Sequence, residues 1–124
     1  MPNKTVTLMK KKNQYPIYEH WYKTLNWILD FSERIPKNAR FSIASRLSNL
    51  SLDILDNIID AIYSKNRRSF LNNINRLLEK LRVLMRLCYD RHYMKLKQYE
   101  NITRAIEETG QMTGGWMKAD GQTG

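Results

Sequence analysis

Residues 71–88 read LNNINRLLEKLRVLMRLC, and this stretch decides the fold class. On a helix that turns by about 100° per residue, its apolar side chains collect in one stripe about 140° wide. The stripe contains Leu71, Ile74, Leu77, Leu78, Leu81, Leu84, Met85 and Cys88. Such a stripe predicts an amphipathic helix that buries one face in a core.

Cationic side chains lie along one flank of this stripe. Arg68, Arg82 and Arg86 fall within a helical sector of about 40°, and Arg82 and Arg86 are one turn apart. Two like charges at this spacing repel each other by about 0.2–0.5 kcal/mol. The flank is therefore either a surface that binds an acidic partner or a solvated face on which Glu79 neutralises Arg82.

The positive charge of the chain is concentrated in the same region. The 124 residues carry a net charge of +9 and have a pI near 9.8. Residues 65–95 contain nine cations and two acidic residues, which leaves +7, and residues 1–12 add +4. Localised charge of this kind favours a binding surface for nucleic acid or an acidic protein over general solubility.

Three further helices are predicted beside the one at 67–89. Pro16 suits the first turn of a helix at 16–34, and Pro36 then interrupts the pattern, because the residue before a proline avoids the α conformation. The next helix is expected at 38–64, and the last at 93–114, where Gly114-Gly115 is typical of a helix stop.

Four helices joined by short turns imply antiparallel neighbours. The sequence thus predicts one all-α domain, an up-down-up-down four-helix bundle over residues 15–118. Residues 1–14 have no apolar periodicity and carry a Lys-Lys-Lys run, so we expect a flexible basic arm. Residues 119–124 are expected to be a disordered tail.

Some apolar residues exceed what one core requires. In the second predicted helix they cover about 200° of the surface, and in the third Val83 and Leu87 point away from the main stripe. We therefore expect a homo-oligomer. The predicted interface residues are Val83, Leu87, Ile43 and Leu50.

No pattern typical of catalysis or metal binding is present. His20, His92 and Cys88 are not spaced with partners as a metal site or a nucleophile–base pair requires. Three carboxylates share one face of the second helix, where a solvated surface is favoured over a metal site: Asp53, Asp56 and Asp60. We expect neither an enzyme nor a cofactor.

Cysteine usage and hydropathy indicate the compartment. The single Cys88 lies on the apolar stripe, as a reduced core residue does. The lysines near the N-terminus are not followed by an apolar run typical of a signal peptide, and no window approaches 18 uninterrupted apolar residues. A cytoplasmic protein without membrane contact is expected.

Three motifs together resemble a known family. They are Ile-Pro-Lys at 35–37, LRVLMR at 81–86 and ETGQMTGGW at 108–116. Their order and spacing resemble the accessory variability determinant (Avd) proteins of diversity-generating retroelements over residues 15–118. The same superfamily includes four-helix proteins encoded in intervening sequences of bacterial large-subunit ribosomal RNA genes.

The resemblance implies a fold and a role. Avd proteins are pentameric rings of four-helix bundles whose basic surface contacts a reverse transcriptase and its structured RNA, so RNA, or DNA, and the reverse transcriptase are the expected partners. The accessory protein is not catalytic and supports mutagenic cDNA synthesis and retrohoming. The alternative is an oligomeric scaffold of the intervening-sequence type, which has no reverse-transcriptase partner.

The family motifs also imply residue roles. The Leu-Arg-x-x-x-Arg motif matches Arg82 and Arg86, which become the first candidates for partner contact. Trp116 is interpreted as packing on the end of the bundle, and Gln111 stands where relatives often carry a basic residue. The full set of predicted binding residues is Arg82, Arg86, Arg68, Arg76, Lys80 and Arg67.

Overall fold

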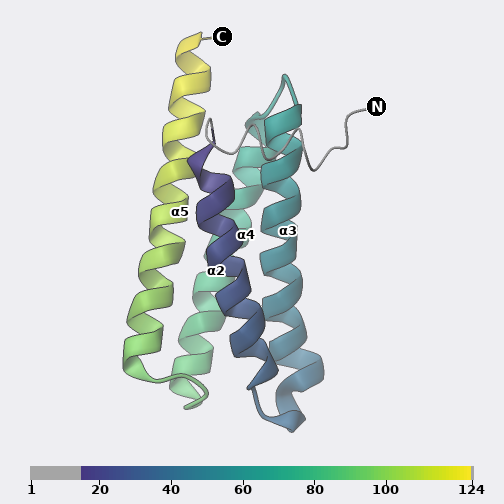
Figure 1. Ribbon diagram of the computed structural model, residues 1–124, viewed down its shortest axis with the longest axis vertical. Helices are drawn as coiled ribbons and strands as arrows, with labels where there is room; N and C mark the ends of the chain where they lie inside the picture. The colour runs from purple at the N-terminus through teal and green to yellow at the C-terminus, as the bar shows by residue number, and fades with distance from the viewer. Residues whose placement is uncertain (1–14, 124) are drawn as a thin grey trace.

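Four long helices make up the fold in a computed structural model that describes residues 15–123. They are α2 (Pro16–Glu33), α3 (Ser45–Tyr63), α4 (Arg68–Asp90) and α5 (Leu96–Thr123). Each runs antiparallel to the one before it, so that α2 begins and α5 ends at the same end of the bundle (Figure 1). The predicted all-α four-helix bundle is confirmed. The predicted basic arm at 1–14 lies outside the described residues.

The core uses the predicted apolar stripe of α4. Six of its eight residues are buried, and Leu77 and Leu84 pack partly buried against them. Opposite this stripe, Trp21 of α2 is fully buried and donates its indole N–H to the Ser51 carbonyl of α3 at 3.0 Å. The Ser51 hydroxyl in turn donates to the Leu47 carbonyl at 2.7 Å. The polar atoms of this part of the core are thereby satisfied.

The helix predicted at 38–64 does not begin as a regular α-helix. A 3-10 turn, η1 (Lys37–Ala39), leads into a π-helical turn, η2 (Arg40–Ala44), and only then does α3 start. The Ser45 hydroxyl donates to the Arg40 carbonyl five residues earlier, at 3.0 Å, which suits the wider π turn. Where a regular helix was expected over 38–64, the chain therefore starts with 3-10 and π turns, and α3 ends at Tyr63.

The turn between α4 and α5 is longer than predicted. His92 has a φ of 64°, its N–H donates to the Tyr89 carbonyl at 3.0 Å, and the Tyr93 N–H donates to the Cys88 carbonyl at 2.9 Å. This pattern is a Schellman motif with histidine at the left-handed position. Gln98 then accepts a hydrogen bond from the Lys95 N–H at 2.9 Å. The last helix thus starts at Leu96 and not at residue 93.

The end of the last helix was also predicted wrongly. Gly114 and Gly115 do not stop α5, which continues to Thr123 and takes in most of the predicted disordered tail. A glycine stop needs a positive φ, and no glycine among residues 15–123 has one. Residue 124 lies outside the described part of the chain.

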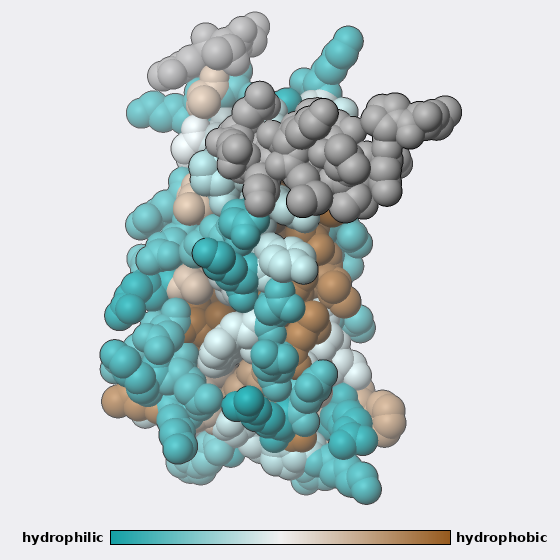
Figure 2. All heavy atoms as spheres, in the orientation of Figure 1, coloured by the Kyte–Doolittle hydropathy of each residue, from teal (hydrophilic) through white to brown (hydrophobic). Residues whose placement is uncertain are grey.

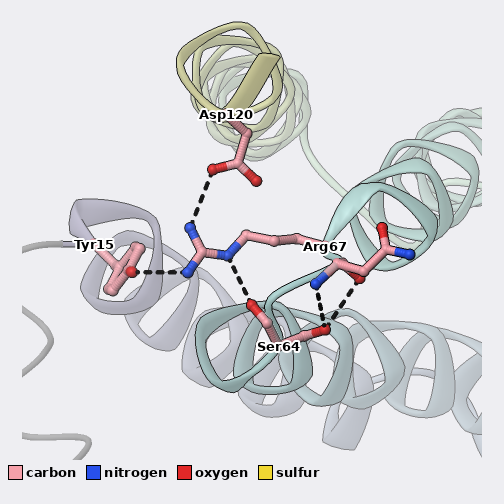
Figure 3. Close-up of polar contacts among 5 residues, drawn as sticks. Tyr15, Ser64, Arg67 and Asp120 are labelled. Carbon is pink, nitrogen blue, oxygen red and sulfur yellow. Dashed lines mark hydrogen bonds and ion pairs between the residues drawn. The ribbon is translucent and has the colours of Figure 1, made fainter. Parts of the chain in front are cut away.

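Arg67 fixes the end of the bundle at which α5 terminates (Figure 3). Its guanidinium donates to Asp120 Oδ1, to the Tyr15 hydroxyl and, through Nε, to the Ser64 carbonyl, each at 3.2 Å. It also lies 5.3 Å from the centre of the Trp116 ring, which packs on the Tyr15 ring at 4.9 Å. Arg67 thus joins the start of α2, the α3–α4 turn and the last turns of α5.

Candidate nucleic-acid and partner-binding surface

The solvent-facing side of α4 carries most of the predicted binding residues. Arg68, Arg76, Lys80 and Arg86 are exposed, and Arg82 is partly exposed. They lie there because the helix turns its apolar stripe inward, which leaves the positions between the stripe residues facing solvent. One rigid helix therefore presents five cationic side chains.

Two of these arginines already make ion pairs. Arg82 Nη1 lies 2.7 Å from Glu79 Oε2, and Arg86 Nε lies 3.3 Å from Asp90 Oδ2. Both pairs are solvent-exposed, so each is worth less than about 1 kcal/mol. Each guanidinium has five N–H donors, and the contacts given use only some of them. The pairs can therefore yield to a phosphate or a carboxylate of a partner.

The cations of α4 fall on two flanks. Asn75 Nδ2 lies 3.8 Å from Met117 Sδ, which places the flank shared by Arg68, Arg82 and Arg86 beside α5. Lys80 instead lines a groove formed with α3, and Arg76 lies one turn before it. We name the residues beside α5, namely Arg68, Arg82 and Arg86, the α5-side cations.

Arg67 stands apart from the other predicted binding residues. Its side chain is mostly buried and its donors are directed to Tyr15, Ser64 and Asp120. Using it to bind a partner would break the contacts that close this end of the bundle. We therefore interpret Arg67 as a structural residue and leave it out of the candidate surface.

Three of the four predicted interface residues share one groove. A cavity of about 670 Å³ lies between η2 and the start of α3 on one side and α4 on the other, and Ile43, Leu50 and Val83 line it. Val83 is 63% exposed, whereas Leu50 is largely buried in the core and offers only an edge. Leu87, also exposed, is not among the lining residues of this groove.

Phe41 and Arg46 belong to this groove and were missed from the sequence. Phe41 is 91% exposed although it is aromatic, and Arg46 lines the same cavity. In the sequence, Phe41 is one of the apolar residues that cover about 200° of the predicted helix at 38–64, and nothing there distinguishes it from the others. The π-helical turn replaces the regular helix at this point. Proline at 36 was the only signal of an irregular start.

Cys88 and His20 lie on different helices, and the His20 ring lies between α2 and α5, with Nε2 3.9 Å from Glu108 Oε2. Burial raises the pKa of the Cys88 thiol to about 11, and His20 Nε2 lies 3.1 Å from the Ala105 carbonyl, between α2 and α5. Within residues 15–123, no group of three or more His, Cys, Asp or Glu side chains is placed to hold a metal ion. None of the described helices combines the length and apolarity needed to cross a membrane.

Comparison with known proteins decides the family. The chain matches the family described as bAvd-like over residues 9–119. It is a member of the bAvd-like family. This match confirms the resemblance to Avd proteins, an accessory, non-catalytic kind of protein that associates with the reverse transcriptase of a retroelement. No curated protein and no solved structure gives a significant match.

Proposed function

We propose that this bAvd-like protein is the accessory subunit of a diversity-generating retroelement. It binds the reverse transcriptase and its structured template RNA, and so supports mutagenic cDNA synthesis and retrohoming. The observation that carries the proposal, beside family membership, is the set of five solvent-facing cations on α4. A rigid row of arginine and lysine suits a phosphate backbone, because each neutralised phosphate releases counterions.

The α5-side cations form the centre of the proposed contact. Arg82 and Arg86 are held by exposed ion pairs of low energy, so replacing Glu79 and Asp90 by phosphates costs little. Arginine also binds phosphate and carboxylate through two parallel N–H bonds. The same flank therefore suits either the RNA or an acidic surface of the enzyme.

The proposed assembly is a ring of identical subunits, a pentamer by family resemblance. Its physical support is the apolar surface that one bundle leaves uncovered, at Val83, Leu87 and the exposed Phe41. In a ring, the α5-side cations of successive subunits would form a continuous belt. Such a belt binds an extended ligand more tightly than one bundle does, since the linked contacts act together.

The test uses the reverse transcriptase of the proposed retroelement and its template RNA. The double variant Arg82→Glu/Arg86→Glu is expected to lose capture of the enzyme–RNA complex in a pull-down, with helicity and oligomer mass unchanged. A matched control, Lys23→Glu/Lys97→Glu, makes the same change in net charge at exposed positions of α2 and α5 and should bind normally. Full binding by the first variant would remove these arginines from the proposal.

The pull-down with and without RNA, and with DNA in its place, separates the partners. Capture of the enzyme without RNA would assign the α5-side cations to a protein contact, and RNA binding without the enzyme would assign them to nucleic acid. A gene located in a ribosomal RNA operon, with binding to neither partner, would favour the scaffold of the intervening-sequence type.

A further inference from the structure

The groove beside α4 has an apolar lining and a cationic edge. Its exposed aromatic residue, Phe41, stands on the π-helical turn, and Val83 and Leu84 face it from α4. Arg46 and Lys80 are also in its lining, which contains no carboxylate. Among residues 15–121, neither Arg46 nor Lys80 forms an ion pair with an acidic side chain. The groove therefore suits an apolar ligand that carries negative charge.

An apolar surface that carries negative charge lies on the same chain, on α3. The outer face of α3 exposes Leu52 (41%) and Tyr63 (44%), with Ile59 partly exposed between them. Three exposed carboxylates lie beside these residues within a helical sector of about 60°. They are Asp53, Asp56 and Asp60, and we call this surface the acidic stripe. Figure 2 shows hydrophobic side chains reaching the surface over α2 and α3 among hydrophilic ones.

The acidic stripe is also uncompensated within the bundle. None of its three carboxylates is in an ion pair given for residues 15–121. Like charges at this spacing on one helix repel one another. Contact with a cationic surface removes that repulsion, while contact with a second acidic stripe increases it.

Charge decides which surfaces pair between copies. Groove against groove would bring Arg46 and Lys80 of one copy towards the same cations of another, and stripe against stripe would do the same with carboxylates. Only groove against stripe joins opposite charges and covers apolar surface on both sides. We propose that the groove of each subunit holds the acidic stripe of the next subunit, in a head-to-tail contact.

This pairing deepens the proposed assembly and rests on it. A head-to-tail contact uses two different surfaces of each subunit, so every copy has two neighbours, as a ring requires. It also divides the cations of the chain into two functions. Arg46 and Lys80 hold the neighbouring subunit, whereas the α5-side cations remain available to the enzyme or the RNA.

The experiment uses two complementary charge reversals in the full chain. The groove variant is Arg46→Glu/Lys80→Glu, and the stripe variant is Asp53→Lys/Asp56→Lys. Each alone is expected to weaken self-association on the order of 100-fold, measured by light scattering across a concentration series. A variant that carries all four changes should restore assembly, because each of its grooves then meets a stripe of opposite charge. Circular dichroism checks that both variants remain helical.

The control variant Arg82→Glu/Arg86→Glu should assemble as the unchanged protein does. Assembly that survives either reversal, or that the combined variant fails to restore, would overturn the pairing while leaving the ring itself standing. A monomeric unchanged protein at high micromolar concentration would overturn both the pairing and the assembly, but not RNA binding by a single bundle. If the groove variant assembles normally and loses only the reverse transcriptase, the groove binds the enzyme and the pairing is wrong.

Discussion

Cys88 is the last residue of the apolar stripe, near the end of α4, and is fully buried. Burial disfavours the charged thiolate, which raises the pKa of this thiol from its ordinary value of 9.0 to about 11. At pH 8 the thiolate fraction is consequently about a hundredfold lower than in the unfolded chain. The thiolate, and not the thiol, attacks an alkylating reagent, so the rate of labelling reports on the opening of α4 around Cys88.

We predict that iodoacetamide labels native Cys88 at least about 100-fold more slowly than the denatured chain. Mass spectrometry follows the reaction, and since this is the only cysteine, one rate describes it. The raised pKa of Cys88 also affects the stability of the protein. The folded state retains its proton while the unfolded state loses it, so the free energy of unfolding falls as pH rises from about 9 to about 11. Fast labelling in native buffer would contradict the buried position.

His92 occupies a backbone conformation that glycine tolerates best. Its φ of 64° costs a residue with a Cβ about 1 kcal/mol, and the Schellman motif requires this conformation. We predict that His92→Gly raises the free energy of unfolding by about 1 kcal/mol, measured by urea denaturation. His92→Ala, which keeps a Cβ, should have little effect. Destabilisation by glycine would assign the histidine ring a contact that outweighs the backbone strain.

At the scale of elements, α5 decides how far the bundle extends. Its last turns contain Gly114 and Gly115 in helical conformation, and a Cβ at either position would meet no atom within 4 Å. Glycine within a helix costs about 0.5–1 kcal/mol relative to alanine. These turns are therefore weak in themselves and are held by Trp116 and by the Arg67–Asp120 contact.

We predict that Gly115→Ala stabilises the protein by about 0.5–1 kcal/mol, because alanine favours the helix and space exists for its methyl group. Thermal unfolding measures the gain, and hydrogen exchange should slow in the segment after residue 110. Gly115→Pro serves as the opposite control, since proline breaks a helix interior. An alanine variant with unchanged or lower stability would contradict a helical conformation at Gly115 and would indicate that α5 ends at Gly114.

Sequence periodicity predicted the bundle because the burial of apolar side chains dominates the stability of such a fold. The α4 stripe and the Pro36 break follow from local rules, and both were correct. The helix stop predicted at Gly114-Gly115 is wrong because glycine allows the chain to leave the helix but does not require it to. The contacts of Arg67 with Asp120 and Trp116 hold the residues beyond the two glycines in the helix. The exposure of Phe41 could not be predicted, because helical periodicity assumes a regular helix and residues 40–44 form a π-helical turn. Arg67 resembled its exposed neighbours in sequence, and only its partners in space distinguish it.

For the whole molecule, the position of the positive charge on α4, and not only the total charge, is expected to determine RNA binding. If the α5-side cations contact phosphates, neutralising all three should reduce the slope of log affinity against log salt by about 2 or more, since each contact contributes about 0.7–0.9. The variant is Arg68→Gln/Arg82→Gln/Arg86→Gln, and fluorescence anisotropy of labelled template RNA across a salt series gives the slope. The matched control Lys23→Gln/Lys97→Gln/Arg104→Gln removes the same charge from exposed positions of α2 and α5. It should lower affinity slightly through net charge and leave the slope within about 0.5 of the original. Equal slopes for both triple variants would mean that the RNA senses only the total charge of the protein, and α4 would then have no special place in its recognition.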